Sequence, residues 1–132
     1  MPAFFDTNIL IYALSEGEKG RNAGDLARQG GWISVQVLNE MVRVMRAKLR
    51  YDWPVIGEAL AEYQAMLGVQ AMTIETHRVG LVMAERHGFA VFDSMIVASA
   101  LLAGCDTLYS EDMHHGLVIE GRLTIINPFK GT

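Results

Sequence analysis

The sequence is poor in cysteine and proline, and it has no long apolar run. Cys105 is the single cysteine, so no disulfide can form within the chain, and a reducing cytoplasm is the expected location. The longest apolar stretch, residues 95–105, is shorter than the roughly 18 residues that span a bilayer, so no membrane span is expected. The N-terminus lacks the basic region and long apolar core of a signal peptide, because Asp6 lies where that core would be.

An excess of positive charge is also missing. The chain carries 11 lysines and arginines against 15 aspartates and glutamates, a formal net charge of −4. No global positive field exists to hold a polyanion, so any contact with nucleic acid must be local. A composition of 51% hydrophobic residues, with 3 prolines, excludes disorder and collagen-like repeats. At this length we expect a single globular domain over residues 1–132.

Short apolar strands alternate with helical segments along the chain. The expected strands are residues 3–5, 32–35, 69–74, 107–109 and 123–126. The expected helices are residues 8–14, 22–29, 36–50, 55–67, 76–87 and 93–103. This alternation predicts an α/β fold with a mostly parallel central sheet and helices on both faces. Ligands of such sheets bind at the carboxyl ends of the strands.

Four acidic residues are expected near that edge of the sheet. Asp6 directly follows the first strand, and Asp112 lies three residues beyond the fourth. Asp93 begins a helix that is apolar nearly all round, and Glu40 lies about one and a half turns into the helix after the second strand. Each also has a structural explanation: Asp6 and Asp93 could cap helices, Asp112 could belong to a turn, and Glu40 could be solvated.

Convergence of the four acids would require a counter-charge. Carboxylates in one cleft repel one another by about 4 kcal/mol for each close pair at an effective dielectric near 20. Stability alone would not assemble such a group, whereas a hard divalent cation reverses the sign of the energy. A ligand set made only of oxygen atoms suits magnesium or manganese. Such an ion can lower the pKa of a water and stabilise charge on a phosphoryl oxygen.

Glu40 is expected at the border between the apolar face and a basic face of its helix. At about 100° per residue, the apolar side chains lie between 40° and 200° from Glu40 on a helical wheel. Arg43, Arg46 and Arg50 lie on the other side, between about 240° and 300°. Guanidinium groups there can bind phosphates bidentately. The alternative is a solvated helix face paired with acids.

The acids lie in four segments that together resemble a known family. These are FFDTNIL at 4–10, SVQVLNE at 34–40, FDSMIVA at 92–98 and LYSEDM at 108–113. In this order and at this spacing they resemble the motifs of PIN-domain ribonucleases. The most similar subgroup is the VapC-like toxins of prokaryotic toxin–antitoxin pairs. The resemblance runs through almost the whole chain.

The resemblance implies catalytic and metal-binding roles for four acids, Asp6, Glu40, Asp93 and Asp112. It makes Asn8 and Ser110 supporting polar residues. It implies a magnesium- or manganese-dependent endoribonuclease that hydrolyses RNA phosphodiester bonds, forms a homodimer and is covered by a cognate antitoxin. The three arginines would then contact RNA, or acids of the antitoxin. Some relatives have a further acid after the last motif, where this chain has His114 and His115, so the number of metal ions stays open.

Other classes of protein fit the sequence less well. A phosphoaspartyl enzyme of the haloacid-dehalogenase type usually has a second aspartate where Asn8 stands. Zinc is disfavoured because the chain has one cysteine and no paired Cys or His motif. A non-catalytic PIN-like module that binds RNA or protein remains the alternative. Loss of an acid would normally mark such a module, and all four acids are present.

Overall fold

The computed structural model describes residues 2–130, and every predicted strand and helix is present there in the predicted order. The strands are β1 (Ala3–Phe5), β2 (Trp32–Ser34), β3 (Gly68–Gln70), β4 (Thr107–Tyr109), β5 (Val118–Ile119) and β6 (Leu123–Ile126). The helices are α1 (Thr7–Tyr12), α2 (Glu18–Arg28), α3 (Val35–Ala47), α4 (Trp53–Met66), α5 (Ile74–His87) and α6 (Val91–Leu102). Strand β5 is the element that the sequence pattern did not predict.

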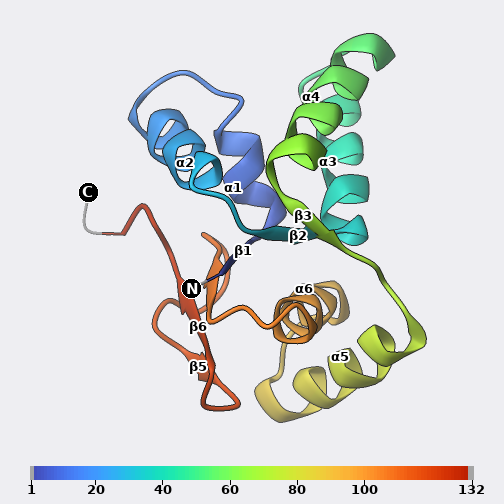
Figure 1. Cartoon of the computed structure of the whole chain (residues 1–132), viewed down its shortest axis with the longest axis vertical. Helices are drawn as coiled ribbons and strands as arrows, with labels where there is room; N and C mark the ends of the chain where they lie inside the picture. The colour runs from blue at the N-terminus through green and yellow to red at the C-terminus, as the bar shows by residue number, and fades with distance from the viewer. Residues whose placement is uncertain (1, 131–132) are drawn as a thin grey trace.

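The strands form one sheet in the order β3-β2-β1-β4-β6-β5, with β1 near its centre. Phe4 of β1 pairs with Trp32 on one side and with Leu108 on the other. All neighbouring strands run parallel except β5 and β6, which are antiparallel. Helices α1 to α4 lie on one side of the sheet and α5 and α6 on the other (Figure 1). The predicted α/β fold, with a mostly parallel sheet covered on both faces, is confirmed.

Helix α6 is buried as its composition predicted. Every residue from 94 to 101 is buried, because the sheet covers one side of this helix and α5 packs against another. Gly80 permits the close approach of α5, since a Cβ at this position would lie 2.6 Å from the Cε of Met95. The start of α6, which carries Asp93, is thereby anchored against the core. No helix in the described part of the chain is long and apolar enough to cross a membrane.

The end of α3 differs from the prediction, which extended this helix to residue 50. The helix ends at Ala47, and Arg50 adopts a left-handed conformation with φ of 57°. The amide of Tyr51 then donates to the carbonyl of Met45, six residues earlier, at 3.0 Å, so the chain folds back onto the last turn of the helix. Glycine is the usual residue where the chain takes a positive φ after a helix, and Arg50 stands there instead, so no local pattern indicated that the helix ends. The wheel position assigned to Arg50 is therefore wrong.

Other boundaries move by a few residues for local reasons. Helix α4 begins two residues earlier than predicted, because the Asp52 carboxylate accepts a hydrogen bond from the amide of Val55 at 3.1 Å and caps it. Strand β3 ends at Gln70, four residues before the predicted end. Beyond it, a capping box between Thr73 and Thr76 starts α5.

Candidate functional site

Asp6 lies where the central strand meets the first helix. Strand β1 ends at Phe5, and Asp6 caps α1 by accepting a hydrogen bond from the amide of Thr7 on Oδ1 at 2.7 Å. Its other oxygen, Oδ2, accepts from the Ser110 hydroxyl at 2.7 Å. The side chain is almost buried, with 6% of the residue surface exposed. Asp6 is therefore an N-cap, one of the two explanations that the sequence left open, and Ser110 contacts this acid directly.

Glu40 faces the same region from α3. Its Oε2 accepts a hydrogen bond from the Thr7 hydroxyl at 2.7 Å, and its Oε1 accepts from Nε2 of Gln36 at 3.2 Å. The same amide nitrogen of Gln36 donates to the carbonyl of Phe92 at 2.8 Å. Glu40 is thus half-buried and tied to both α1 and the start of α6, so the solvated alternative for this residue is wrong.

Asp112 is held by Asn8. The Nδ2 of Asn8 donates to Oδ2 of Asp112 at 3.0 Å, and the Oδ1 of Asn8 accepts from the amide of Glu111 at 3.3 Å. One side chain therefore bridges the start of α1 and the bend after β4. The supporting role that the resemblance implies for Asn8 stays a prediction.

Asp93 lies in the first turn of α6 and is half-buried. The helix begins two residues before Asp93, and Ala90 is the N-cap, so the capping explanation for Asp93 is wrong. A carboxylate in the first turn still meets the positive end of the helix dipole.

The four acids share one cleft of about 460 Å³ at the carboxyl end of the strands. Asp6, Glu40, Asp93 and Asp112 all line it, although they come from four separate segments of the chain. The sequence prediction that these side chains converge is borne out by this geometry. Their roles in catalysis or metal binding remain predictions.

The carboxylates in the cleft repel one another. Burial raises the pKa of Asp6 from 3.8 to about 6, against the lowering effects of the Ser110 hydroxyl and the Thr7 amide. The charges of Asp93 and Glu40 raise it further. Burial also raises the pKa of Asp93, with added repulsion from Glu40 and Asp112. Negative charge in this cleft is therefore costly without a cation.

The donor set suits a hard cation, because all four side chains offer carboxylate oxygen. As the side chains stand, no three acidic, imidazole or thiol groups in the described residues are arranged to enclose one ion. Hydrogen bonds hold three of the four carboxylates on neighbouring polar groups. The carboxylates would have to turn toward one another to share a cation. In chemistry the residues fit magnesium or manganese.

The three arginines do not form one continuous stripe. Arg43 lines a second cleft that adjoins the first at Glu40. The guanidinium of Arg46 lies 4.9 Å from the centroid of the Trp53 ring, and its Nη1 donates to the carbonyl of Tyr51 at 3.2 Å. Arg50 lies beyond the helix, as described above. Their contact with RNA remains a prediction, and Arg43 has the most suitable position.

Thr7 and Lys48 are polar residues of the cleft to which the sequence analysis assigned no role. The Thr7 hydroxyl binds Glu40, and Lys48 brings a cation into the cleft wall. Lys48 follows Glu40 by eight residues, which places it at about 80° on the same wheel, so a signal for it existed. Thr7 lay inside the first motif, but no local pattern indicated its partner.

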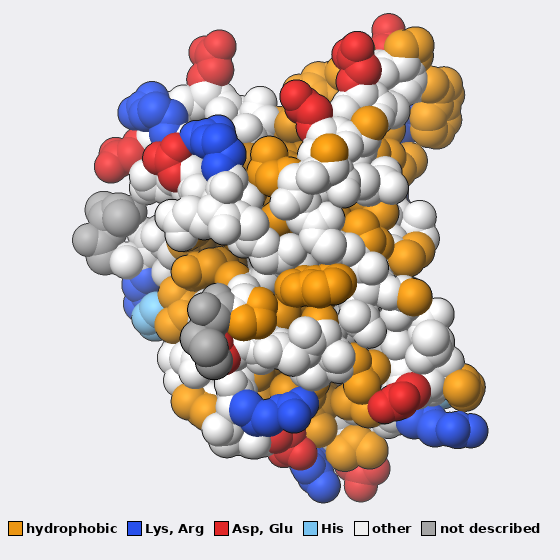
Figure 2. Space-filling view, in the orientation of Figure 1, with side chains coloured by type: hydrophobic (Ala, Val, Ile, Leu, Met, Phe, Trp, Pro, Cys, Tyr) orange, Lys and Arg blue, Asp and Glu red, His pale blue; other side chains and the backbone are white. Residues whose placement is uncertain are grey.

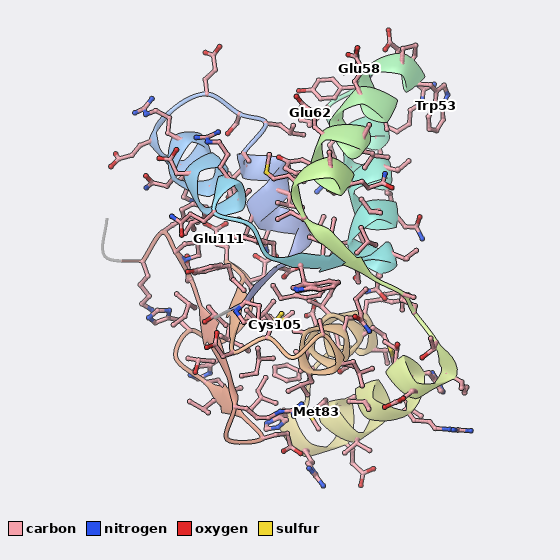
Figure 3. All side chains as sticks on the ribbon, viewed as in Figure 1. Trp53, Glu58, Glu62, Met83, Cys105 and Glu111 are labelled. Carbon is pink, nitrogen blue, oxygen red and sulfur yellow. The ribbon has the colours of Figure 1, made fainter. Side chains whose placement is uncertain are left out.

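Glu111 also lines the cleft and is already neutralised. Its carboxylate accepts from the Tyr12 hydroxyl at 2.6 Å and from Nζ of Lys19 at 2.5 Å, close to helices α1 and α2 (Figure 3). These two hydrogen bonds lower the pKa of Glu111. Nζ of Lys19 also lies 4.6 Å from the centroid of the Tyr12 ring. Glu111 is therefore less available to a cation than the four acids.

Comparison with known proteins gives one family and several similar structures. The family model described as PIN domain matches residues 3–116. A toxin–antitoxin complex from Klebsiella pneumoniae is similar with a TM-score of 0.72 and 20% identity, over 96% of this chain and 98% of that chain. The toxin VapC20 of Mycobacterium tuberculosis, which cleaves the sarcin–ricin loop, has a TM-score of 0.67 and 19% identity, over 83% of this chain and 89% of that one.

A third similar structure is VapBC2 from Rickettsia felis bound to a fragment of its promoter DNA. It has a TM-score of 0.61 and 21% identity, over 85% of this chain and 89% of that chain. No curated protein sequence matches significantly. At these identities the similar structures show that the fold is shared.

Proposed function

Because the chain belongs to the PIN domain family, we propose that it is a magnesium- or manganese-dependent endoribonuclease and the toxin of a toxin–antitoxin pair. The observation that carries the proposal is the convergence of Asp6, Glu40, Asp93 and Asp112 in one cleft. Repulsion among these carboxylates disfavours the folded chain, so a function rather than stability explains why they are gathered.

The four acids would hold the cation, and neighbouring side chains would orient them. Thr7 donates to Glu40, Asn8 to Asp112 and Ser110 to Asp6, so these three donors limit the directions in which carboxylate oxygens face. A divalent cation bound there would lower the pKa of a water molecule and neutralise charge on a phosphoryl oxygen. The reaction is hydrolysis of an RNA phosphodiester bond.

Positive charge beside the acids would position the RNA backbone. Lys48 lines the acidic cleft, and Arg43 lines the adjoining one. With a net charge of −4 on the whole chain, these local cations provide the attraction for phosphates that flank the cleaved bond.

The proposed protein partners are a cognate antitoxin and a second copy of the chain. The antitoxin is supported by two similar structures, one described as a toxin–antitoxin complex and the other as VapBC2 bound to promoter DNA. Hydrophobic side chains gather where α3 ends and α4 begins (Figure 2), where Trp53 is 59% exposed and projects from the body of the molecule (Figure 3). Exposed apolar side chains gathered in one place are typical of protein interfaces. Sedimentation of the purified chain, alone and with the product of the neighbouring gene, tests both partners.

Metal-dependent cleavage of RNA is the direct test. Purified, antitoxin-free protein should cleave single-stranded RNA with magnesium or manganese and lose activity after exhaustive chelation. Asp6→Asn and Asp93→Asn should abolish cleavage while the circular dichroism spectrum stays native. Glu58→Gln removes an acid on the exposed face of α4, remote from the cleft, and should leave cleavage unchanged.

The outcomes separate the two functions under consideration. Cleavage that survives chelation would show that the proposed mechanism is wrong. RNA binding by the wild-type protein without cleavage under any divalent cation would instead favour the non-catalytic module.

A further inference from the structure

We propose that Phe92 is a stacking platform for an unpaired base of the RNA, next to the cleavage site. The inference rests on the proposed function, because it requires RNA in the acidic cleft. Phe92 is 71% exposed, the largest exposed fraction among the large hydrophobic side chains of the described residues. It directly precedes Asp93, one of the four acids. Its ring contributes little to the core, so packing does not explain an aromatic residue here.

Phe92 lines a second cleft of about 600 Å³. The other residues of this cleft are Gln36, Asn39, Glu40, Arg43 and Met72. Glu40 lines both this cleft and the acidic one, so the two are continuous at that side chain. An RNA strand whose phosphate lies among the acids therefore has a neighbouring nucleotide within reach of Phe92.

The backbone of Phe92 is held in a defined position relative to the acids. Nε2 of Gln36 donates both to the Phe92 carbonyl at 2.8 Å and to Oε1 of Glu40 at 3.2 Å. Gln36 is itself only 9% exposed, so this brace is shielded from water. Phe92 lies in the first turn of α6, and this helix is buried from Ser94 to Leu101. The ring is thus presented to solvent from a rigid support, which lowers the cost of ordering it when a ligand binds.

The chemistry of the second cleft matches a nucleotide. Every base has a π-face that stacks on an aromatic ring, and such stacking needs a base that is not already paired. Met72 provides a further apolar surface, while Asn39 offers amide groups and Arg43 a phosphate-binding cation. A purely apolar partner surface would leave these polar groups without partners. Stacking tolerates any base, so Phe92 would add affinity rather than base choice.

Binding of short single-stranded RNA tests the proposal in magnesium and in an Asp6→Asn background, which blocks cleavage while a cation can still offset the charge of the acids. In these binding measurements, the protein with Phe92 intact in this background serves as wild type. Oligoadenylate, oligocytidylate and oligouridylate serve as probes, and a 2-aminopurine reporter in the RNA detects stacking directly. Phe92→Ala should weaken binding of all three by about 5- to 150-fold, the range expected for one lost stacked base. Reporter quenching by the wild-type protein should be lost in the same variant.

Two matched variants complete the experiment. Phe92→Trp keeps an aromatic face and should retain both affinity and quenching. Val91→Ala removes the neighbouring exposed apolar side chain, which does not line the cleft, and should bind like wild type. Thermal melting of each variant verifies that it is folded.

Three results would overturn the inference. The first is wild-type affinity and quenching in Phe92→Ala. The second is loss of affinity without loss of quenching. The third is a change in sedimentation mass of Phe92→Ala that accounts for the lost affinity, which would assign Phe92 to a contact between copies of the chain. In each case, metal-dependent cleavage by the wild-type protein would leave the proposed function standing. Failure of wild-type cleavage and binding would refute the proposed function itself.

Discussion

Replacing Asp6 with asparagine should stabilise the metal-free protein at neutral pH. The folded structure holds the pKa of Asp6 at about 6, against 3.8 for an ordinary aspartate, mainly because the carboxylate is buried. Folding therefore favours the protonated form. Above about pH 6 both the folded and the unfolded chain are ionised at this residue, and the folded chain bears the full cost. A difference of about two pH units corresponds to about 3 kcal/mol.

The sign of the effect depends on pH. As the pH falls from about 6 to about 4, the folded chain binds a proton before the unfolded chain does, so the cost decreases and then disappears. The introduced asparagine would keep the cap on α1, since its oxygen can still accept from the Thr7 amide. It would lose the bond that the Ser110 hydroxyl donates to Oδ2 of the aspartate, at a cost of about 1 kcal/mol. Asp6→Asn should therefore stabilise the protein by about 2 kcal/mol near pH 8 and destabilise it by about 1 kcal/mol near pH 4, where only the lost Ser110 bond remains.

Urea unfolding in chelator across this pH range measures the difference. Asp52→Asn is the matched control, because Asp52 also caps a helix through its carboxylate but lies exposed and outside the cleft. Asparagine caps helices about as well as aspartate, so this control should change stability little at any pH. The reasoning is refuted if Asp6→Asn destabilises the protein near pH 8, or if its effect does not vary with pH.

Three further predictions concern the cation and the RNA. Magnesium or manganese should stabilise the wild-type protein by about 2.7 kcal/mol at a hundredfold excess over Kd and so raise its melting temperature. The melting temperature of Asp93→Asn should rise much less. No rise in wild type at concentrations that saturate cleavage would contradict a shared metal site. Arg43→Ala should make the slope of log RNA affinity against log salt concentration shallower by about one. Arg46→Ala should change this slope less, because the Arg46 guanidinium lies over Trp53. Equal slopes for wild type and both variants would assign these side chains to structure or to the antitoxin. Asn8→Ala should weaken cation binding by about 10- to 100-fold, since it removes the donor that orients Asp112; unchanged affinity in a calorimetric titration would show that this hydrogen bond is dispensable.

Local patterns in the sequence predicted the helices, all strands except β5, and the edge of the sheet at which the four acids meet. Phe4 and Phe5 form an apolar run that stops at a capping acid, and the structure shows a buried strand followed at once by a helix. The apolar run after Asp93 predicted a helix buried on most faces, and α6 is buried in this way. Such signals depend on neighbours within a few residues, so one sequence suffices to detect them.

Local sequence patterns failed at two places. At the end of α3 the glycine that usually marks a helix end is absent, and β5 depends on a contact with another strand. The chain turns away after α3 at Arg50, in a left-handed conformation that favours glycine, so the helix was predicted too long. Strand β5 has two residues and exists because it pairs with β6. A pattern needs more length than this to distinguish a strand from a loop.

The partners of the acids were decided by the tertiary structure alone. Ser110 binds Asp6 across 104 positions of the chain, because the register of β1 against β4 places Phe5 opposite Tyr109 and so brings the next residue of each strand together. The same parallel alignment brings Asn8 within reach of Asp112. Residue types and spacing show which side chains can bind a cation or orient a carboxylate. Which of them meet depends on strand register and helix packing, and these are set by the burial of the whole core rather than by any local segment.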